Sequence, residues 1–315
     1  MEEIKNHSAK FAFFYLLSLV ALLFMAISTG TVIFQIINKY IADFAASYPH
    51  RYSSGALKFA ISSLVVSVPI FYLTTARIQK NLFRGKLDPE SGIRRWLTYF
   101  IMFVASVVMI VWVIVTINSF LSGELTLRFG LKFLTVLVIA GSIFGYYFYD
   151  IKREGIKETK DLVIKYSFWI SLVAVMAVFL AGLFIVESPW ETRKKNLDRE
   201  VLNNLSAIER GVQNYYEKEN SLPQDLKELQ EVSIYIKDMD LTDPETGEKY
   251  EYQVLDRGKY ELCANFRTSN LEDEENFYRN EKWPHKAGEK CFELEAQIKE
   301  EAPEPDSPEP TAESR

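Results

Sequence analysis

The sequence is poor in the residues that build metal centres and disulfide frameworks, because its 315 residues include only 3 His and 2 Cys. Two cysteines are too few for a disulfide-dense mini-protein. The chain also lacks a glycine-rich loop that would cradle phosphates, a zinc-type His/Glu helix and a nucleophile in a triad-like setting. We therefore expect neither an enzyme nor a cofactor.

Charged residues are missing from long stretches of the first part, although they make up an ordinary 25% of the chain and the mean hydropathy is -0.04. Residues 1–190 carry 18 basic and 11 acidic side chains, whereas residues 191–315 carry 18 and 31, so their formal charges are +7 and -13. This segregation excludes a single soluble globule. The chain also has no basic stripe of the kind that binds nucleic acid.

Five runs without a charged residue are long enough to cross a bilayer, which requires about 20 mainly apolar residues. The first run is far longer than the apolar part of a signal peptide and lacks a small-residue cleavage site, so we interpret it as a retained helix. The second contains Pro69, which neighbouring helices can accommodate. The runs are residues 11–37, 59–76, 96–117, 133–149 and 166–186.

Lys and Arg are shared unevenly between the loops that join these runs. Loops 77–95 and 150–165 carry six and five of them, whereas loops 38–58 and 118–132 carry three and two. The positive-inside rule therefore places the N-terminal residues 1–10 in the cytoplasm. After five spans the C-terminal domain lies outside the cytoplasmic membrane, although a basic cluster directly after the last span opposes this orientation.

The interior of the spans offers Ser, Thr and a few amides but no ionisable residue. Ionisable residues inside a membrane usually mark ion or proton pathways. Because the spans lack such residues, helix packing is the simpler interpretation of the bundle. A small-solute transporter or channel subunit is the alternative function. Gly141 and Gly145 have the small-xxx-small spacing that allows close helix contact, and Ala26 with Gly30 repeats it.

Three stretches of this half resemble a bacterial membrane-domain family that is catalogued only as a domain of unknown function. They are residues 13–43 (FFYLLSLVALLFMAISTGTVIFQIINKYIAD), 87–96 (LDPESGIRRW) and 123–152 (GELTLRFGLKFLTVLVIAGSIFGYYFYDIK). The resemblance extends over roughly residues 10–185. It implies an integral membrane domain and supplies no activity.

A new helix is predicted to begin at Pro189, because Ser188 and Glu191 have the spacing of a capping box and proline suits the first helical position. Its apolar residues recur every three or four positions up to Glu219, which indicates one buried stripe. The stripe consists of Leu197, Val201, Leu205, Ile208, Val212 and Tyr215.

After this helix we expect a short helix over residues 221–230 and then a small antiparallel sheet. Alternating side chains predict strands over residues 249–255, 259–267 and 290–298, with Gly258 in the hairpin turn between the first two. We therefore divide the chain into an N-terminal segment, a transmembrane domain, an extracytoplasmic α+β domain and a disordered acidic, proline-rich tail. These are residues 1–10, 11–187, 188–298 and 299–315.

Both cysteines fall on the polar faces of their predicted strands. Cys263 and Cys291 could therefore form a cross-strand disulfide, which would contribute roughly 3–4 kcal/mol and requires an oxidising compartment. The alternative is a metal site that uses both cysteines and His285. That set lacks a fourth ligand and the short paired spacing of zinc sites.

The order of motifs after the last span resembles a pseudopilin or type IV pilin globular domain, over about residues 195–298. In that family the apolar anchor is N-terminal and follows a short cleaved leader, whereas here four other spans precede the anchor and we see no leader. The matching motifs are Asn214-Tyr215-Tyr216-Glu217, Ser221-Leu222-Pro223, Leu226 with Leu229, Asp243-Pro244-Glu245-Thr246-Gly247, Tyr250-Glu251-Tyr252 and Tyr260-Glu261-Leu262-Cys263.

Some pseudopilins bind calcium, and an acidic run in this domain supplies weak candidate ligands: Asp238, Asp240, Asp243 and Glu245. The run lacks the glycine and the final glutamate of an EF-hand loop, so a solvated turn is the preferred interpretation. The expected function is that of a non-enzymatic bacterial membrane protein that displays an interaction domain. We expect its partners to be the lipid bilayer and other envelope proteins or further copies of itself, in envelope assembly or a secretion or pilus-like apparatus.

Overall fold

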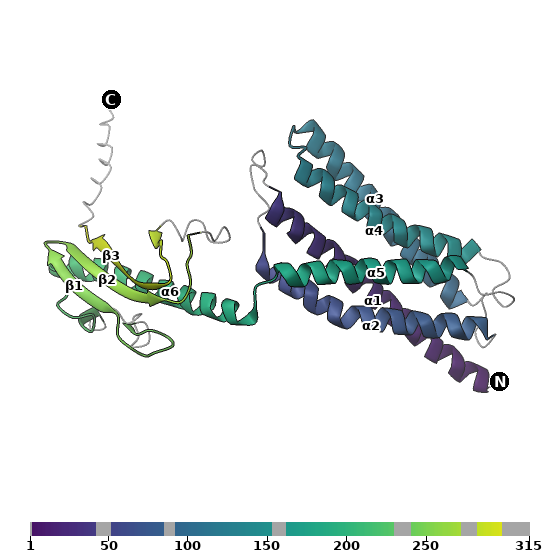
Figure 1. Cartoon of the computed structure of the whole chain (residues 1–315), viewed down its shortest axis with the longest axis horizontal. Helices are drawn as coiled ribbons and strands as arrows, with labels where there is room; N and C mark the ends of the chain where they lie inside the picture. The colour runs from purple at the N-terminus through teal and green to yellow at the C-terminus, as the bar shows by residue number, and fades with distance from the viewer. Residues whose placement is uncertain are drawn as a thin grey trace, which may run out of the picture. The chain divides into compact units, whose positions relative to one another are not determined.

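The computed structural model describes residues 2–41, 52–84, 92–152, 162–229, 241–271 and 282–297 (Figure 1). The chain divides into two compact units, residues 1–187 and 188–315. The first unit contains α1 (Glu2–Tyr40), α2 (Ser54–Phe83), α3 (Gly92–Leu121), α4 (Leu127–Lys152) and α5 (Leu162–Ile185). The second contains α6 (Pro189–Glu219), β1 (Glu251–Asp256), β2 (Lys259–Phe266) and β3 (Gly288–Glu295).

Five helices are long and apolar enough to cross a membrane, as predicted. The qualifying segments are longer than the charge-free runs, because the helices continue past the apolar stretch into residues that can reach the membrane surface. Pro69 lies inside α2, which stays one helix through it. The segments are residues 12–40, 54–82, 92–121, 127–152 and 162–185.

The bundle is organised as two helical hairpins and one further helix. α1 lies mainly against α2 and α3 mainly against α4, so each hairpin forms a closely packed pair (Figure 1). The core between α1, α2 and α5 contains the fully buried Val32, Leu57 and Leu64. Most side chains of α3 and α5 are exposed within the unit, which suits helices that face hydrocarbon.

Close glycine packing occurs at a different place from the one predicted. A Cβ added at Gly141 or Gly145 would meet no atom within 4 Å outside its own stretch of helix, so neither glycine marks a close helix approach among the described residues. Gly182 of α5 is the tight position, because its Cβ would lie 3.0 Å from Cγ1 of Val32 and 3.4 Å from Cγ1 of Ile61. A glycine there lets α5 approach α1 and α2 closely.

The second unit begins with a capped helix. Ser188 is the N-cap of α6, its hydroxyl accepts a hydrogen bond from Glu191 N at 3.2 Å, and Pro189 follows as the first helical residue. The carboxylate of Glu191 lies 3.6 Å from Nζ of Lys194, so the structure shows the serine half of the capping box. Asn220 ends the helix in the left-handed conformation with φ 52°.

α6 packs its apolar stripe on a three-stranded antiparallel sheet of order β1-β2-β3. Buried residues of this stripe include Val201, Leu205, Ile208 and Val212, which were all predicted. The three strands lie close to their predicted ranges. β1 ends one residue later than predicted, and β3 begins two residues earlier, at Gly288. In the hairpin Gly258 has φ +80°, and an added Cβ would lie only 3.1 Å from the Ala296 carbonyl oxygen, so the turn requires glycine.

The short helix predicted over residues 221–230 is not a regular helix over its described part. Residues 221–227 are irregular, with bends and a turn, and helical geometry begins at Glu228, while residue 230 lies outside the described residues. Leu222, Leu226 and Leu229 are buried in the core of the unit. The three leucines are therefore buried as their spacing suggested, although only Leu229 lies in helical geometry. The tail 299–315 also lies outside the described residues.

Candidate functional site

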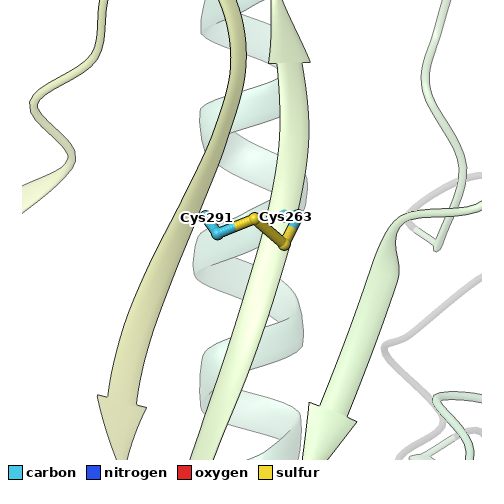
Figure 2. The surroundings of a disulfide bond; sticks show 2 residues. All are labelled: Cys263 and Cys291. Atoms are coloured by element: carbon cyan, nitrogen blue, oxygen red, sulfur yellow. A yellow bond between two sulfur atoms is a disulfide. The ribbon is translucent and has the colours of Figure 1, made fainter.

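The two cysteines form a disulfide between neighbouring strands (Figure 2). Cys263 of β2 stands directly opposite Cys291 of β3 in the antiparallel register, and their Cα atoms lie 4.0 Å apart. Cys263 is buried and Cys291 is half-buried. The disulfide closes a loop with a sequence separation of 28 residues, and it links β3 covalently to the central strand β2.

The disulfide excludes the metal alternative. Among the described residues, Glu261, Cys263 and Cys291 are the group with metal-ligand spacing, and both sulfurs in it are bonded to each other. A metal binds the thiolate form of cysteine, which a disulfide does not provide. His285 is buried elsewhere in the core, where its ring stacks on Phe266 with ring centroids 3.7 Å apart.

The environment of His285 disfavours protonation of its ring. Nδ1 lies 2.9 Å from the Trp283 carbonyl oxygen, and the backbone N–H donates to Oδ1 of Asn270 at 2.9 Å. Burial lowers the pKa of His285 below its ordinary value, against the opposing effects of the Trp283 carbonyl and Asp198. Nε2 is buried and has no hydrogen-bond partner among the described residues. A proton placed there would therefore be costly.

The described members of the predicted calcium set are held by an arginine. The carboxylate of Asp243 accepts hydrogen bonds from Glu245 N at 2.9 Å and Thr246 N at 3.0 Å, and from Arg267 at 2.6 Å. Glu245 accepts from Nε of Arg267 at 2.9 Å. The guanidinium thus occupies the place that a cation would need. Asp238 and Asp240 lie outside the described residues.

Arg267 also joins this turn to α6. Its guanidinium lies 3.8 Å from Asp198, whose buried carboxylate accepts the backbone N–H groups of Arg267 at 2.8 Å and Thr268 at 2.7 Å. Burial alone would raise the pKa of Asp243, but the hydrogen bonds from Arg267 and from two backbone N–H groups hold it below its ordinary value. The hydrogen bond to Asp243 in turn raises the pKa of Arg267. The network thus connects α6, the end of β2 and the turn at Asp243, and its role is structural.

A buried ion pair lies in the membrane unit, where the charge-free runs suggested none. Arg94 of α3 donates to the carboxylate of Asp150 of α4 at 2.6 Å and to the Asp150 carbonyl oxygen at 3.1 Å. Both side chains are 7% exposed. Each residue lies just beyond a charge-free run, in a turn of helix that the sequence prediction assigned to a loop.

The ion pair forms part of the wall of a cavity of about 40 Å³ at the end of the bundle where α3 begins and α4 ends. The hydroxyl of Tyr15 on α1 is buried beside it and has no hydrogen-bond partner among the described residues. Polar side chains from all four helices α1 to α4 reach the wall. They are Tyr15, Ser18, Thr75, Gln79, Arg94, Thr98, Tyr146, Tyr147 and Asp150.

Two further buried cations, Arg128 and Lys132 of α4, lie at the far end of the bundle. Arg128 of α4 is 9% exposed, and its guanidinium donates to the carbonyl oxygens of Asn38 at 3.3 Å and Ile41 at the C-terminus of α1. The last carbonyls of a helix have no partner within the helix and carry negative partial charge. Arg128 therefore caps α1 from a neighbouring helix, which explains how the bundle tolerates this charge.

Residues 12–147 match the family described as a domain of unknown function, DUF5671. The match covers α1 to α3 and most of α4, including Tyr15 and Arg94 of the cavity, and ends before Asp150. It is shorter than the resemblance that the sequence suggested, which extended through α5. No curated protein and no solved structure matches the chain. The pseudopilin resemblance thus has no support from these comparisons.

Proposed function

We propose that this protein is a non-enzymatic component of the cytoplasmic membrane that displays residues 188–298 outside the cytoplasm as an interaction domain. The observation that carries the proposal is the Cys263–Cys291 disulfide in the unit that follows five potential spans. Disulfides persist in oxidising compartments. The loop charges favour a cytoplasmic N-terminus, and with an odd number of spans this orientation supports the proposal that the unit lies on the oxidising side.

The architecture of the second unit supports an interaction role of the pseudopilin kind. One long helix follows directly after a span and packs on a small antiparallel sheet. β1 is an edge strand of that sheet, and its Val254 and Leu255 are 37% and 48% exposed. An exposed apolar edge is where another chain can add a strand. The partners would be other envelope proteins or further copies of this chain, in envelope assembly or a secretion or pilus-like apparatus.

Site-specific photo-crosslinking in the native membrane tests this proposal on the full chain. A photoreactive residue in place of Leu255 reports on the β1 edge, and the same residue in place of the exposed Arg210 on α6 is the matched control. We expect discrete adducts from position 255 that are absent from position 210. Adducts from neither position, or the same adducts from both, would contradict an interaction surface at this edge.

The buried Arg94–Asp150 pair and its cavity favour small-solute transport by the bundle as a second candidate function. Ionisable groups inside a membrane bundle often line a pathway. Reconstitution of the full chain into vesicles tests it: transport predicts solute flux that Asp150→Asn abolishes. Vesicles that remain as tight as lipid alone would exclude it.

A further inference from the structure

The first turns of α6 carry a charge opposite to that of the rest of their unit. Residues 191–199 contain four basic and two acidic side chains, whereas residues 200–315 contain 14 and 29. Among the described residues, the buried apolar core of the unit includes no residue of α6 before Val201, so most of the basic segment precedes the core. The basic side chains, here called the junction cluster, are Arg193, Lys194, Lys195 and Arg199.

The two acidic residues of this segment do not neutralise the cluster. Asp198 is buried, its carboxylate accepts two backbone N–H groups and it lies 3.8 Å from the guanidinium of Arg267, so its charge is balanced by another part of the unit. Glu191 lies 3.6 Å from Nζ of Lys194, but these side chains are 49% and 34% exposed, so solvent weakens their pairing. The segment therefore keeps positive charge on its surface.

Two arginines and a tryptophan of this segment are exposed. No carboxylate pairs with Arg193 in the part of the chain that the structure describes, and Arg199 donates to Oδ1 of Asn196 at 3.0 Å. Trp190 is 64% exposed, although its ring is large and mainly apolar. Basic side chains beside an exposed tryptophan are typical of helices at a membrane surface, where the ring reaches the headgroup level.

Chain connectivity keeps the segment near the bilayer. α5 ends at Ile185 and α6 begins at Pro189. An extended residue spans about 3.6 Å, so the Cα atoms of these two residues lie within about 14 Å of each other. A helix rises about 1.5 Å per residue, so Arg193 stays within about 20 Å of the end of α5 in whichever direction α6 runs. Because the polar layer of a bilayer is about 5–8 Å thick and charges act over about 8–10 Å, the headgroups are within reach.

We propose that Trp190 and the junction cluster bind the headgroups of anionic phospholipids and hold the start of α6 on the bilayer surface. Phosphate oxygens accept charge-assisted hydrogen bonds from guanidinium and ammonium groups. The acidic residues 200–315 are repelled by the same surface, so the cluster also selects which end of the unit faces the lipid. The proposal depends neither on the compartment in which the unit lies nor on a partner at β1, so it stands apart from the proposed function.

Quenching of a fluorophore by nitroxide-labelled lipid headgroups tests the proposal on the full chain in vesicles. Asn196→Cys provides the labelling site, and the reagent reacts with this thiol alone because Cys263 and Cys291 are bonded to each other. The vesicles carry the same fraction of nitroxide headgroups in neutral phosphatidylcholine or in a mixture with anionic phosphatidylglycerol. We expect several-fold stronger quenching in the anionic vesicles, and high salt should remove the difference. Equal quenching in both kinds of vesicle would overturn the proposal.

Two double variants separate binding by the cluster from a general effect of net charge. A basic side chain near an anionic surface strengthens binding about fivefold, so Arg193→Gln with Lys194→Gln should lower the ratio of bound to detached α6 by about 30-fold. Arg210→Gln with Lys218→Gln removes the same charge from exposed positions farther along α6, and it should change the ratio less than about twofold. A similar loss in both double variants, or a loss in neither, would overturn the proposal.

Discussion

Removing the charge of Arg267 should destabilise the second unit, because Arg267 pairs with Asp243 and Glu245. In Arg267→Gln the carboxylate of Asp243, whose side chain is 9% exposed, loses a hydrogen bond of 2.6 Å from a cation. Breaking a buried pair by removing one partner costs about 3–5 kcal/mol. Arg267 itself is 15% exposed and Glu245 is 47% exposed, so we take the lower end, about 3 kcal/mol.

Amide hydrogen exchange of the full chain measures this change locally. Opening of β2 (Lys259–Phe266) should become roughly 100- to 200-fold more frequent in Arg267→Gln, once rates are divided by intrinsic exchange rates. Arg257→Gln in the hairpin turn is the matched control, because Arg257 is exposed, and it should change exchange less than about threefold.

The stabilisation by the Arg267–Asp243 pair should depend on pH in a definite direction. The folded-state pKa of Asp243 lies below its unfolded value, so the stabilisation is fully present above about pH 4 and is lost as pH falls through the folded pKa. The difference between wild type and Arg267→Gln should therefore shrink in acid. A difference below about 1 kcal/mol at neutral pH, or one that acid leaves unchanged, would refute the view that Arg267 clamps a buried carboxylate.

Three further predictions concern the disulfide, the buried histidine and the glycine of α5. The double variant Cys263→Ala and Cys291→Ala should lose about 3.5 kcal/mol for a separation of 28 residues, measured by exchange of the same strand, and a loss under about 1 kcal/mol would contradict this. Because burial lowers the folded-state pKa of His285, stability of its unit should decline as pH falls below about 6.5, and His285→Phe should flatten that decline in a denaturation series. Gly182→Ala should lower the unfolding temperature of the bundle, since its Cβ meets Val32 at 3.0 Å, while Gly141→Ala should not, and equal effects would contradict the assigned packing.

Features that depend on local signals were predictable from the sequence. The five spanning segments follow from charge-free length, and the start of α6 follows from Ser188 and Pro189. The pairing of Cys263 with Cys291 followed from side-chain alternation in two strands, because a period of two puts both on one face of the sheet. In each case the decisive information lies within one element or in two neighbouring strands.

Features that depend on distant parts of the chain were missed. Arg94 and Asp150 are 56 positions apart and lie outside the charge-free runs, so hydropathy assigned both to loops, although helix ends with aromatic neighbours could have suggested longer helices. Gly182 packs tightly and Gly141 does not. Which glycine allows a close contact depends on where another helix approaches, and the spacing of glycines in one helix does not reveal this. Asp243 was expected in a solvated turn and was only a weak candidate for calcium, and its ion pair with Arg267, 24 positions away, was not predicted.

The central claim is that the unit with the disulfide lies outside the cytoplasm. Thiol labelling of intact cells with a membrane-impermeant reagent tests it directly, because Cys263 and Cys291 are the only two cysteines of the chain and give no background. The account predicts labelling of both after treatment with an impermeant reductant and none before it. Labelling without reduction would contradict the disulfide, and labelling only after cell lysis would contradict the location.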